Sequence, residues 1–168
     1  VSRGLGDVYK RQGEDNGVDF TKLNGIVGLF APNASGKSAL LDALAFCLFD
    51  LSTRAVRAND IINKSKTNMH CKLNFEIDGT DYFIEKRGKK NLRSGHVKVD
   101  IDFWMIDENG DTTSLNGDQR RTTQLNIRKV IGDFEDFILT SMSSQNDSTV
   151  FINKTQKERK ELLSQFMG

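Results

Sequence analysis

Apolar residues gather in two neighbouring segments near the start of the chain. Residues 25–30 (GIVGLF) form a short apolar run without strict alternation, which predicts a strand buried on both faces. Residues 37–49 (KSALLDALAFCLF) are apolar on nearly every side except at Asp42, which predicts a buried helix. A polar, basic connector follows as far as about residue 68. We therefore expect a strand, a short loop and a helix in succession.

Strict alternation marks the middle of the chain. Three segments alternate between apolar and polar positions, as half-buried strands do. Two pairs that end in glycine predict hairpin turns, one between the first two segments and one after the third. The segments are residues 70–77, 82–86 and 97–106, and the turn pairs are Asp78-Gly79 and Asn109-Gly110. This pattern predicts an antiparallel β lobe over residues 70–115.

The last part of the chain is predicted to be mainly helical. Residues 118–131 form a polar helical pattern with a narrow apolar stripe. Residues 137–142 are expected to form a short strand that leads into the polar loop 143–147. Thr155 and Glu158 have the spacing of a capping box, which predicts that a helix begins there and continues to residue 168.

Composition narrows the class of protein. The chain has 168 residues, and its formal charge of +1 gives no global signal for binding a polyanion. Its 11 Phe, 2 Tyr and 1 Trp suffice for the core of one soluble domain or of part of a larger one. No apolar run approaches the about 18 residues of a membrane span, so no membrane partner is expected. The only cysteines and histidines lack the spacing of a zinc site or a disulfide framework: Cys47, Cys71, His70 and His96.

The first 12 residues have no hydrophobic period, no signal-peptide core and no capping pattern. They resemble a translated sequencing-adapter remnant of the kind found at the ends of assembled metagenomic fragments. We expect residues 1–12 to be a non-native leader; a native strand or a flexible leader is the alternative.

The strongest chemical signal is APNASGKS, residues 31–38, between the predicted strand and the predicted helix. This is the context of a Walker A phosphate loop, whose backbone N–H groups and helix N-terminus supply partial positive charge to a polyphosphate. We expect Lys37 to bridge the β- and γ-phosphates of ATP and the Ser38 hydroxyl to ligate Mg²⁺. The predicted nucleotide-binding residues are Pro32, Asn33, Ala34, Ser35, Gly36, Lys37, Ser38 and Ala39.

The loop departs from the GxxxxGK[ST] pattern at its first position, where Ala31 stands in place of glycine. If that position needed a positive φ, the alanine Cβ would cost about 1 kcal/mol. The alternative to a phosphate loop is a Gly/Ser turn followed by an ordinary surface lysine. The strand and helix predicted on either side disfavour that alternative.

The run IVGLFAPNASGKSALLDALAFCLF resembles the start of the SMC-like ATPase heads, and above all the SbcC group of double-strand-break-repair ATPases, including T4-like phage recombination endonuclease subunits. RANDIIN (residues 57–63) resembles the connector of that family, and FEIDGTDYFIEKR resembles its β lobe. The resemblance implies an α/β fold: a P-loop NTPase of ABC/SMC type with an antiparallel β-rich subdomain. Residues 13–168 would form the N-terminal half of the head, and the helix from residue 155 would lead toward a coiled coil.

The resemblance also implies a mechanism. Gln145, in the sequence SSQND, corresponds to the family's Q-loop glutamine, which would contact Mg²⁺ or the attacking water. A polar-loop glutamine without that role is the alternative. The family's signature motif, Walker B aspartate and water-activating glutamate do not occur in this sequence. The resemblance therefore implies an ATPase that hydrolyses ATP only together with its C-terminal head half and a second copy. It would act on DNA with an SbcD-type metallophosphoesterase nuclease as its partner. Its location would be the cytoplasm of a bacterial cell or of a phage-infected host.

Six cations without an intervening acidic residue occupy residues 86–98, which are predicted to lie mostly in a loop between two strands. They are Lys86, Arg87, Lys89, Lys90, Arg93 and Lys98. Such a loop could contact DNA phosphates, with an affinity that depends on salt, or it could be a solvated hairpin. Of the neighbours Phe103 and Trp104, at least one is expected in the core rather than on a base-stacking surface.

Two other functions remain open. An SMC or condensin-like chromosome organiser would have the same ATP site. A P-loop kinase or GTPase is less favoured, because the guanine motif NKxD is absent and a large β insertion after the first helix is unusual for a kinase.

Overall fold

The structure is a computed structural model that describes residues 17–32, 37–51, 62, 66–134, 137, 141 and 155–167. The chain divides into two compact units, residues 1–131 and 132–168. The elements of the first unit are η1 (Phe20–Lys22), α1 (Lys37–Phe49), β1 (Asn68–Ile77), β2 (Thr80–Lys90), β3 (Val97–Ile106), β4 (Thr112–Ser114) and α2 (Arg120–Ile131). The second unit contains α5 (Gln156–Met167).

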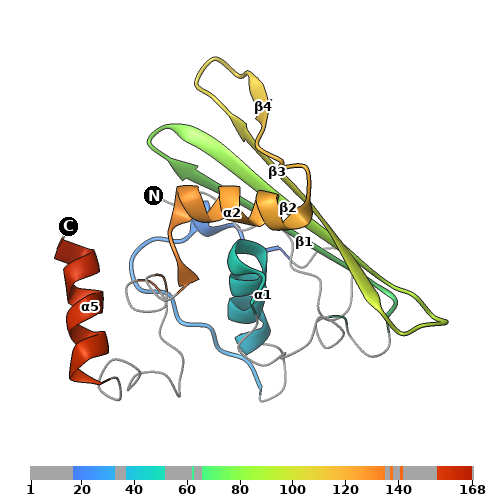
Figure 1. The fold of residues 1–168 in the computed structure, drawn as a ribbon, viewed down its shortest axis with the longest axis horizontal. Helices are drawn as coiled ribbons and strands as arrows, with labels where there is room; N and C mark the ends of the chain where they lie inside the picture. The colour runs from blue at the N-terminus through green and yellow to red at the C-terminus, as the bar shows by residue number, and fades with distance from the viewer. Residues whose placement is uncertain are drawn as a thin grey trace. The chain divides into compact units, whose positions relative to one another are not determined.

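The first unit contains a four-stranded antiparallel sheet in the order β1-β2-β3-β4 (Figure 1). Asp78 and Gly79 both have positive φ angles, 50° and 79°, as a tight hairpin turn requires. Cys71 pairs with Lys86, and Lys86 pairs with Ile101. The predicted β lobe is thus observed, but β2 continues four residues beyond the predicted end. The neighbouring strands account for the extra length. β1 pairs with β2 as far as Lys89, and β3 pairs with it as far as Lys90.

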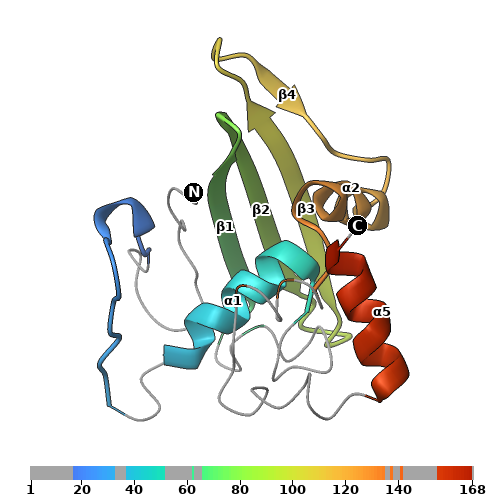
Figure 2. The ribbon, with the colours of Figure 1, turned by 90° about the vertical axis from the view of Figure 1, so that its left-hand side faces the viewer.

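Helices α1 and α2 lie on the same face of the sheet (Figure 2). The inward positions of the strands supply apolar residues to the interface, among them Leu73, Ile84 and Phe103. Phe103 is fully buried, whereas Trp104 lies on the opposite face and stacks on Phe83 with ring centroids 5.3 Å apart. The prediction that at least one of these neighbours belongs to the core is confirmed, and the buried residue is Phe103.

Helix α1 has the predicted bounds, but its burial is uneven. From Asp42 to Phe49 the helix is almost entirely buried, with Leu40, Leu41 and the first turn more exposed. The helix ends where Asp50 adopts a positive φ of 62°. Aspartate is one of the few non-glycine residues that tolerate this conformation, which stops the helix.

The predicted strand at residues 25–30 is wrong for this structure. None of these residues is in a strand, and their apolar side chains are exposed: Ile26 is 105%, Phe30 94% and Leu29 60% accessible. A strand needs neighbouring backbone to pair with, and within the described residues the sheet is made of β1–β4 alone. The apolar run identified a segment suited to burial, and the residues that would cover it are not supplied by the described part of the chain.

The second unit begins its helix as predicted. The Thr155 N–H and hydroxyl both donate to Glu158 Oε2 at 2.7 Å, and the Glu158 N–H donates to Thr155 Oγ1 at 3.4 Å. The strand predicted at residues 137–142 is wrong at its start, because Phe137 is helical and its N–H donates to Asp133 O at 3.1 Å. This local bond four residues back replaces the ladder bond that a strand would need. In the described part of the chain, no helix is both long and apolar enough to cross a membrane.

Candidate functional site: the phosphate-binding end of helix α1

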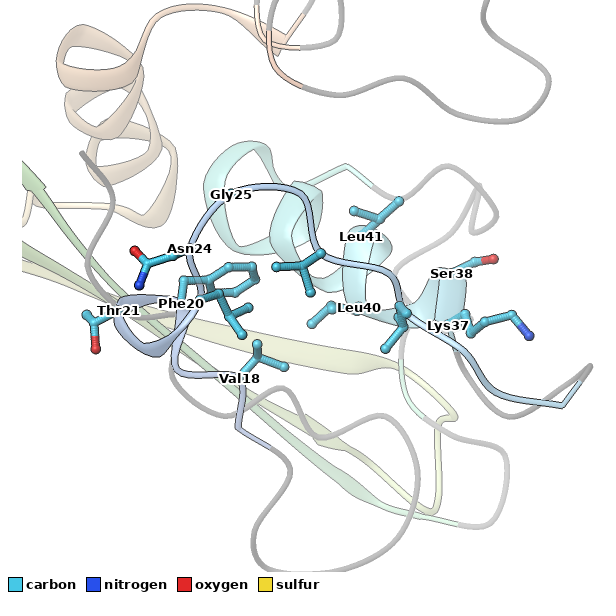
Figure 3. Close-up of a pocket in the computed structure, with 12 residues that line it drawn as sticks. Val18, Phe20, Thr21, Asn24, Gly25, Lys37, Ser38, Leu40 and Leu41 are labelled. Carbon is cyan, nitrogen blue, oxygen red and sulfur yellow. The ribbon is translucent and has the colours of Figure 1, made fainter.

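The start of α1 carries the two side chains that the sequence assigns to phosphate and metal. Lys37 is the first residue of the helix and Ser38 the second, and Ser38 is exposed. Figure 3 shows both side chains directed to the same side of the helix start, away from Phe20 and Val18. A helix N-terminus offers unpaired backbone N–H groups and partial positive charge, so it favours an anion at this position.

The Lys37 ammonium turns back over the beginning of the loop. It donates hydrogen bonds to the backbone oxygens of Ala31 and Pro32, the second at 2.9 Å. These bonds hold the ammonium beside residues 31 and 32, the start of the predicted phosphate loop. Because both acceptors are neutral carbonyls, a polyphosphate would be a stronger partner for the ammonium than the groups it now contacts.

Ala31 is compatible with this geometry. Among the described residues, the non-glycine residues with positive φ are Asp50 and Asp78, and Ala31 is not one of them. The strain that a left-handed alanine would bring is therefore absent at this position. The departure from glycine has no backbone cost in this structure.

An apolar cavity of about 810 Å³ lies beside the helix start (Figure 3). Its walls come from three segments: residues 18–21, the exposed apolar run after Leu23, and the first turns of α1, including Leu40 and Leu41. Lys37 and Ser38 are part of its lining, but their polar ends are directed elsewhere in Figure 3. The cavity therefore adjoins the residues predicted to bind phosphate, and its walls are mainly apolar.

The remaining predicted nucleotide-site residues divide into two groups. Pro32 and Ala39 are described, Pro32 as a carbonyl acceptor for Lys37 and Ala39 as a half-buried residue of the first helical turn. The others lie outside the described residues: Asn33, Ala34, Ser35, Gly36 and Gln145. The structure therefore brings together Lys37, Ser38 and the start of the loop.

The other end of α1 is held by a buried ionic network. Lys86 of β2 is fully buried, and its ammonium donates to Phe46 O at 2.7 Å, Asp50 Oδ1 at 2.7 Å and Gln124 Oε1 at 3.0 Å. Arg120 of α2 donates to the second Asp50 oxygen at 2.6 Å. All three ammonium protons thus have acceptors, as a buried charge requires.

The assignment of Lys86 to DNA binding is therefore wrong. Lys86 is the last residue of the predicted strand 82–86 and lies within β2, at a position in phase with the inward-facing Ile84, and its ammonium is fully enclosed. A phosphate could not reach this charge without dismantling the packing of α1 on the sheet. Its neighbour Arg87 points to the opposite face, as alternation along a strand requires.

Burial and ion pairing act in opposite directions on the two charged groups of the network. Burial lowers the pKa of Lys86, and the facing Asp50 carboxylate only partly offsets that effect. Burial alone would raise the pKa of Asp50, but the Lys86 ammonium and the Arg120 guanidinium together hold it below its usual value. Asp50 is consequently a carboxylate at neutral pH.

The outward cations of the same region differ in how their charge is used. Arg87 pairs with Glu85 at 2.7 Å and with Asp102 at 3.2 Å, and Lys98 pairs with Asp100 at 2.9 Å. Within the described residues, Lys89, Lys90 and Arg93 have no ion-pair partner, and Lys89 and Arg93 are exposed. Lys89, Lys90 and Arg93 are the predicted DNA contacts whose charge is still available to a phosphate.

Sequence reasoning missed the network that joins Asp50, Lys86 and Gln124. One signal was present: strict alternation from Tyr82 through Ile84 places Lys86 on the inward face. Nothing in the sequence indicated that the end of α1 and the start of α2 would meet it there.

Within the described residues, no cluster of three or more His, Cys, Asp or Glu side chains could hold a metal ion. Cys47 and Cys71 are free and buried, and burial raises the pKa of the Cys47 thiol.

The sequence is similar to several known proteins. The AAA domain family matches residues 9–166. The chain is 40% identical over 161 residues to protein R555 of Acanthamoeba polyphaga mimivirus, and the aligned region covers 92% of this chain and 12% of that protein. It is 27% identical over 154 residues to the SbcC subunit of the nuclease SbcCD of Deinococcus radiodurans, covering 90% and 16%. It is 30% identical over 152 residues to the DNA double-strand break repair Rad50 ATPase of Thermoplasma volcanium, covering 88% and 15%.

These matches agree with the phosphate loop and with the β lobe on which α1 packs. The chain spans 12–16% of the length of these relatives, so the matches describe one part of a larger architecture. The family match includes all of residues 31–38, the predicted phosphate loop, and most of both units. The chain therefore belongs to the AAA domain family, as an α/β P-loop NTPase whose sequence is that of an N-terminal SbcC/Rad50-like ATPase head.

Proposed function

We propose that this chain is the ATP-binding half of an ATPase that acts in DNA double-strand-break repair or recombination. ATP binding and hydrolysis would be coupled to the processing of DNA ends by a partner nuclease of the SbcD metallophosphoesterase type. The observation that carries the proposal is the start of α1, where Lys37 and Ser38 direct their side chains to the same side of the helix and Lys37 contacts Pro32 O. The similarity to proteins named as part of a nuclease and as a repair ATPase supports the choice of pathway.

The residues at the start of α1 fit ATP with Mg²⁺. Lys37 would contact the β- and γ-phosphates, and the exposed Ser38 hydroxyl is an oxygen ligand of the kind that Mg²⁺ prefers. Bound Mg²⁺ would neutralise negative charge on the phosphates. Gln145 is proposed as the residue that contacts Mg²⁺ or the attacking water, and Asn33, Ala34, Ser35 and Gly36 as the loop that surrounds the phosphates.

The partners follow from the same proposal. The exposed apolar residues between Ile26 and Phe30 suit contact with other sequence, as proposed for the C-terminal half of the head. Hydrolysis would need that half and a second copy, which would enclose ATP between two heads. The proposed location is the cytoplasm of a bacterial cell or of a phage-infected host.

DNA is the proposed substrate of the complete assembly, and Lys89, Lys90 and Arg93 are proposed to contact its phosphates. Lys89→Gln and Arg93→Gln should each reduce the slope of log affinity against log salt by about 0.9, the value for one lost phosphate contact. Lys22→Gln is the matched control, because Lys22 is also exposed but lies in η1. A slope that Lys89→Gln and Arg93→Gln leave unchanged would assign these residues to a solvated hairpin.

An SMC or condensin-like chromosome organiser is the second candidate, because it would use the same ATP site. The two candidates differ in the partner rather than in the phosphate loop. Copurification and nuclease assays with a metallophosphoesterase partner would separate them. Stable association and ATP-dependent cleavage of DNA ends favour repair, and DNA bridging without cleavage favours chromosome organisation.

The phosphate-loop assignment is tested by Lys37→Ala. Titration calorimetry with Mg-ATP should show binding by the wild-type chain and its loss in the variant, because the ammonium that meets the phosphates is removed. Lys89→Ala removes an equal charge from an exposed strand position and should bind as the wild type does. Equal affinity of the Lys37→Ala and wild-type chains would refute the assignment.

Turnover gives a separate test of the half-site hypothesis. The chain without further sequence should hydrolyse ATP at a negligible rate, since it lacks the Walker B and signature motifs. Steady-state hydrolysis by the purified monomer that Lys37→Ala abolishes would contradict the hypothesis and leave the phosphate loop intact.

A further inference from the structure

The two halves of α1 have different amounts of packing around them. Lys37 and Ser38 are in the first turn, and nearby Leu41 remains 41% exposed. In the second half, Phe46 is 3% and Phe49 0% exposed. Within the described residues, the direction of the helix is therefore set mainly by contacts at its C-terminal end. A straight helix of 13 residues transmits that direction to its first turn, about 20 Å away.

The contacts at the C-terminal end are directional as well as apolar. Phe46 O accepts the Asp50 N–H at 3.0 Å and the Lys86 ammonium at 2.7 Å. Leu48 O accepts the Gln124 side-chain N–H at 2.5 Å. Gln124 of α2 thus satisfies a carbonyl that the helix end leaves open, and Lys86 of β2 adds a second hydrogen bond to a carbonyl that already accepts a backbone N–H. The Lys86 ammonium is also 5.0 Å from the centre of the Phe46 ring and lies at the negative end of the helix dipole.

Asp50 locks the arrangement by joining three elements. It ends α1 in the left-handed conformation, and its two carboxylate oxygens bind Lys86 of β2 and Arg120 of α2. Glycine would adopt the same φ with less strain, but it could not make either ion pair. The presence of an aspartate at this helix end is explained by the two cations that it holds.

We propose that Lys86 is a positioning residue for the nucleotide site. Together with Asp50 it fixes the last turn of α1 against β2 and α2, and the rigid helix then presents Lys37 and Ser38 to the phosphates in one direction. This inference rests on the proposed binding of ATP at the start of α1. The Lys86 charge would thus affect ligand affinity from the opposite end of α1, a helix about 20 Å long.

The test measures Mg-ATP affinity by titration calorimetry, well below the midpoint of thermal unfolding of each variant, with the folded fraction checked by circular dichroism. Lys86→Met removes the charge and keeps an unbranched side chain, and Asp50→Asn removes the opposite charge while tolerating the same φ. Lys72→Met is the matched control, because it makes the same substitution on the outward face of the sheet, in β1, where the Lys72 ammonium lies over the rings of Phe83 and Trp104. Asp50→Asn also keeps the inference testable if Lys86→Met does not fold.

The folded Lys86→Met and Asp50→Asn chains should bind Mg-ATP about tenfold more weakly than the wild type, and Lys72→Met should bind within about twofold. A purely structural role would lower the unfolding midpoint and leave the affinity of the folded molecules unchanged, which would overturn the inference. Wild-type and Lys37→Ala chains are measured alongside. If the wild type does not bind ATP, or if Lys37→Ala binds equally well, the phosphate-loop proposal fails; if only the Lys86 effect is missing, the positioning inference alone fails.

Discussion

The two ends of helix α1 differ in what the surrounding chain does for them. At the C-terminal end, apolar side chains and a buried ion-pair network fix the helix against the sheet and α2. At the N-terminal end, Lys37 contacts the loop that precedes it, and the apolar run before that loop is exposed. The packed end and the proposed ligand-binding end are thus separate parts of one helix, and substitutions at the two ends should change the free energy of unfolding by different amounts.

The largest expected difference in stability is between two phenylalanine substitutions, one at the C-terminal end of α1 and one in the apolar run before its N-terminal end. Phe49→Ala removes a fully buried ring beneath the network, and should lower the free energy of unfolding by about 3–5 kcal/mol. Phe30→Ala removes a ring that is 94% exposed, and should change it by less than about 0.5 kcal/mol. Urea denaturation of both variants, followed by circular dichroism, gives the two values. Comparable losses would mean that the run around Phe30 is packed in solution and that the contrast between the two ends is wrong.

A second pair compares two aspartates with positive φ. Asp50→Asn breaks both ion pairs and leaves the buried Lys86 ammonium without its carboxylate, so it should cost about 2–3 kcal/mol. Asp78→Asn changes a hairpin-turn residue with a φ of 50°, which asparagine also adopts, and should be nearly neutral. Denaturation at neutral pH measures both changes. If the two variants lose equal stability, the loss belongs to the backbone conformation and the ion pairs contribute little.

The same pair has a pH signature. The pKa of Asp50 is lower in the folded chain than its ordinary value, so the unfolded state binds more protons between those two pKa values. The stabilisation by this carboxylate is therefore complete above its unfolded pKa of about 3.9, and is lost as the pH falls through the folded pKa. Unfolding free energies measured from neutral to acid pH should fall less steeply for Asp50→Asn than for the wild type. Parallel curves would contradict the assigned charge of Asp50.

Local patterns were sufficient to predict much of the scaffold. The apolar run that ends at Phe49 gave the bounds of α1, and the alternation around Phe75 gave the strands, because both periodicities follow from backbone geometry. The glycine after Asp78 fixed the hairpin turn, which needs positive φ at both positions. These features depend on short stretches of chain, so they were visible without the tertiary structure.

The errors concern contacts between distant residues. The cations from Lys86 to Lys98 are predicted to contact DNA phosphates or solvent, yet a lysine can be buried where Asp50, Gln124 and a helix carbonyl meet it. The run that ends at Phe30 was assigned to a strand because its side chains suit burial, but a strand also needs neighbours to pair with. Neither requirement can be read from the local pattern.

The smallest expected effect concerns a third helix end, the start of α5. Unlike the start of α1, where Lys37 and Ser38 are the proposed ligand contacts, this end is capped by its own residues, since Thr155 and Glu158 exchange hydrogen bonds. Thr155→Ala removes the hydroxyl and should destabilise the first turn by about 1 kcal/mol, whereas Thr155→Ser keeps the cap and should have little effect. Amide hydrogen exchange over residues 156–159 should accelerate roughly fivefold in the alanine variant alone. If the serine variant exchanges as fast as the alanine variant, the hydroxyl is not the cap, and the contrast between a capped helix end and a ligand-facing helix end loses its support.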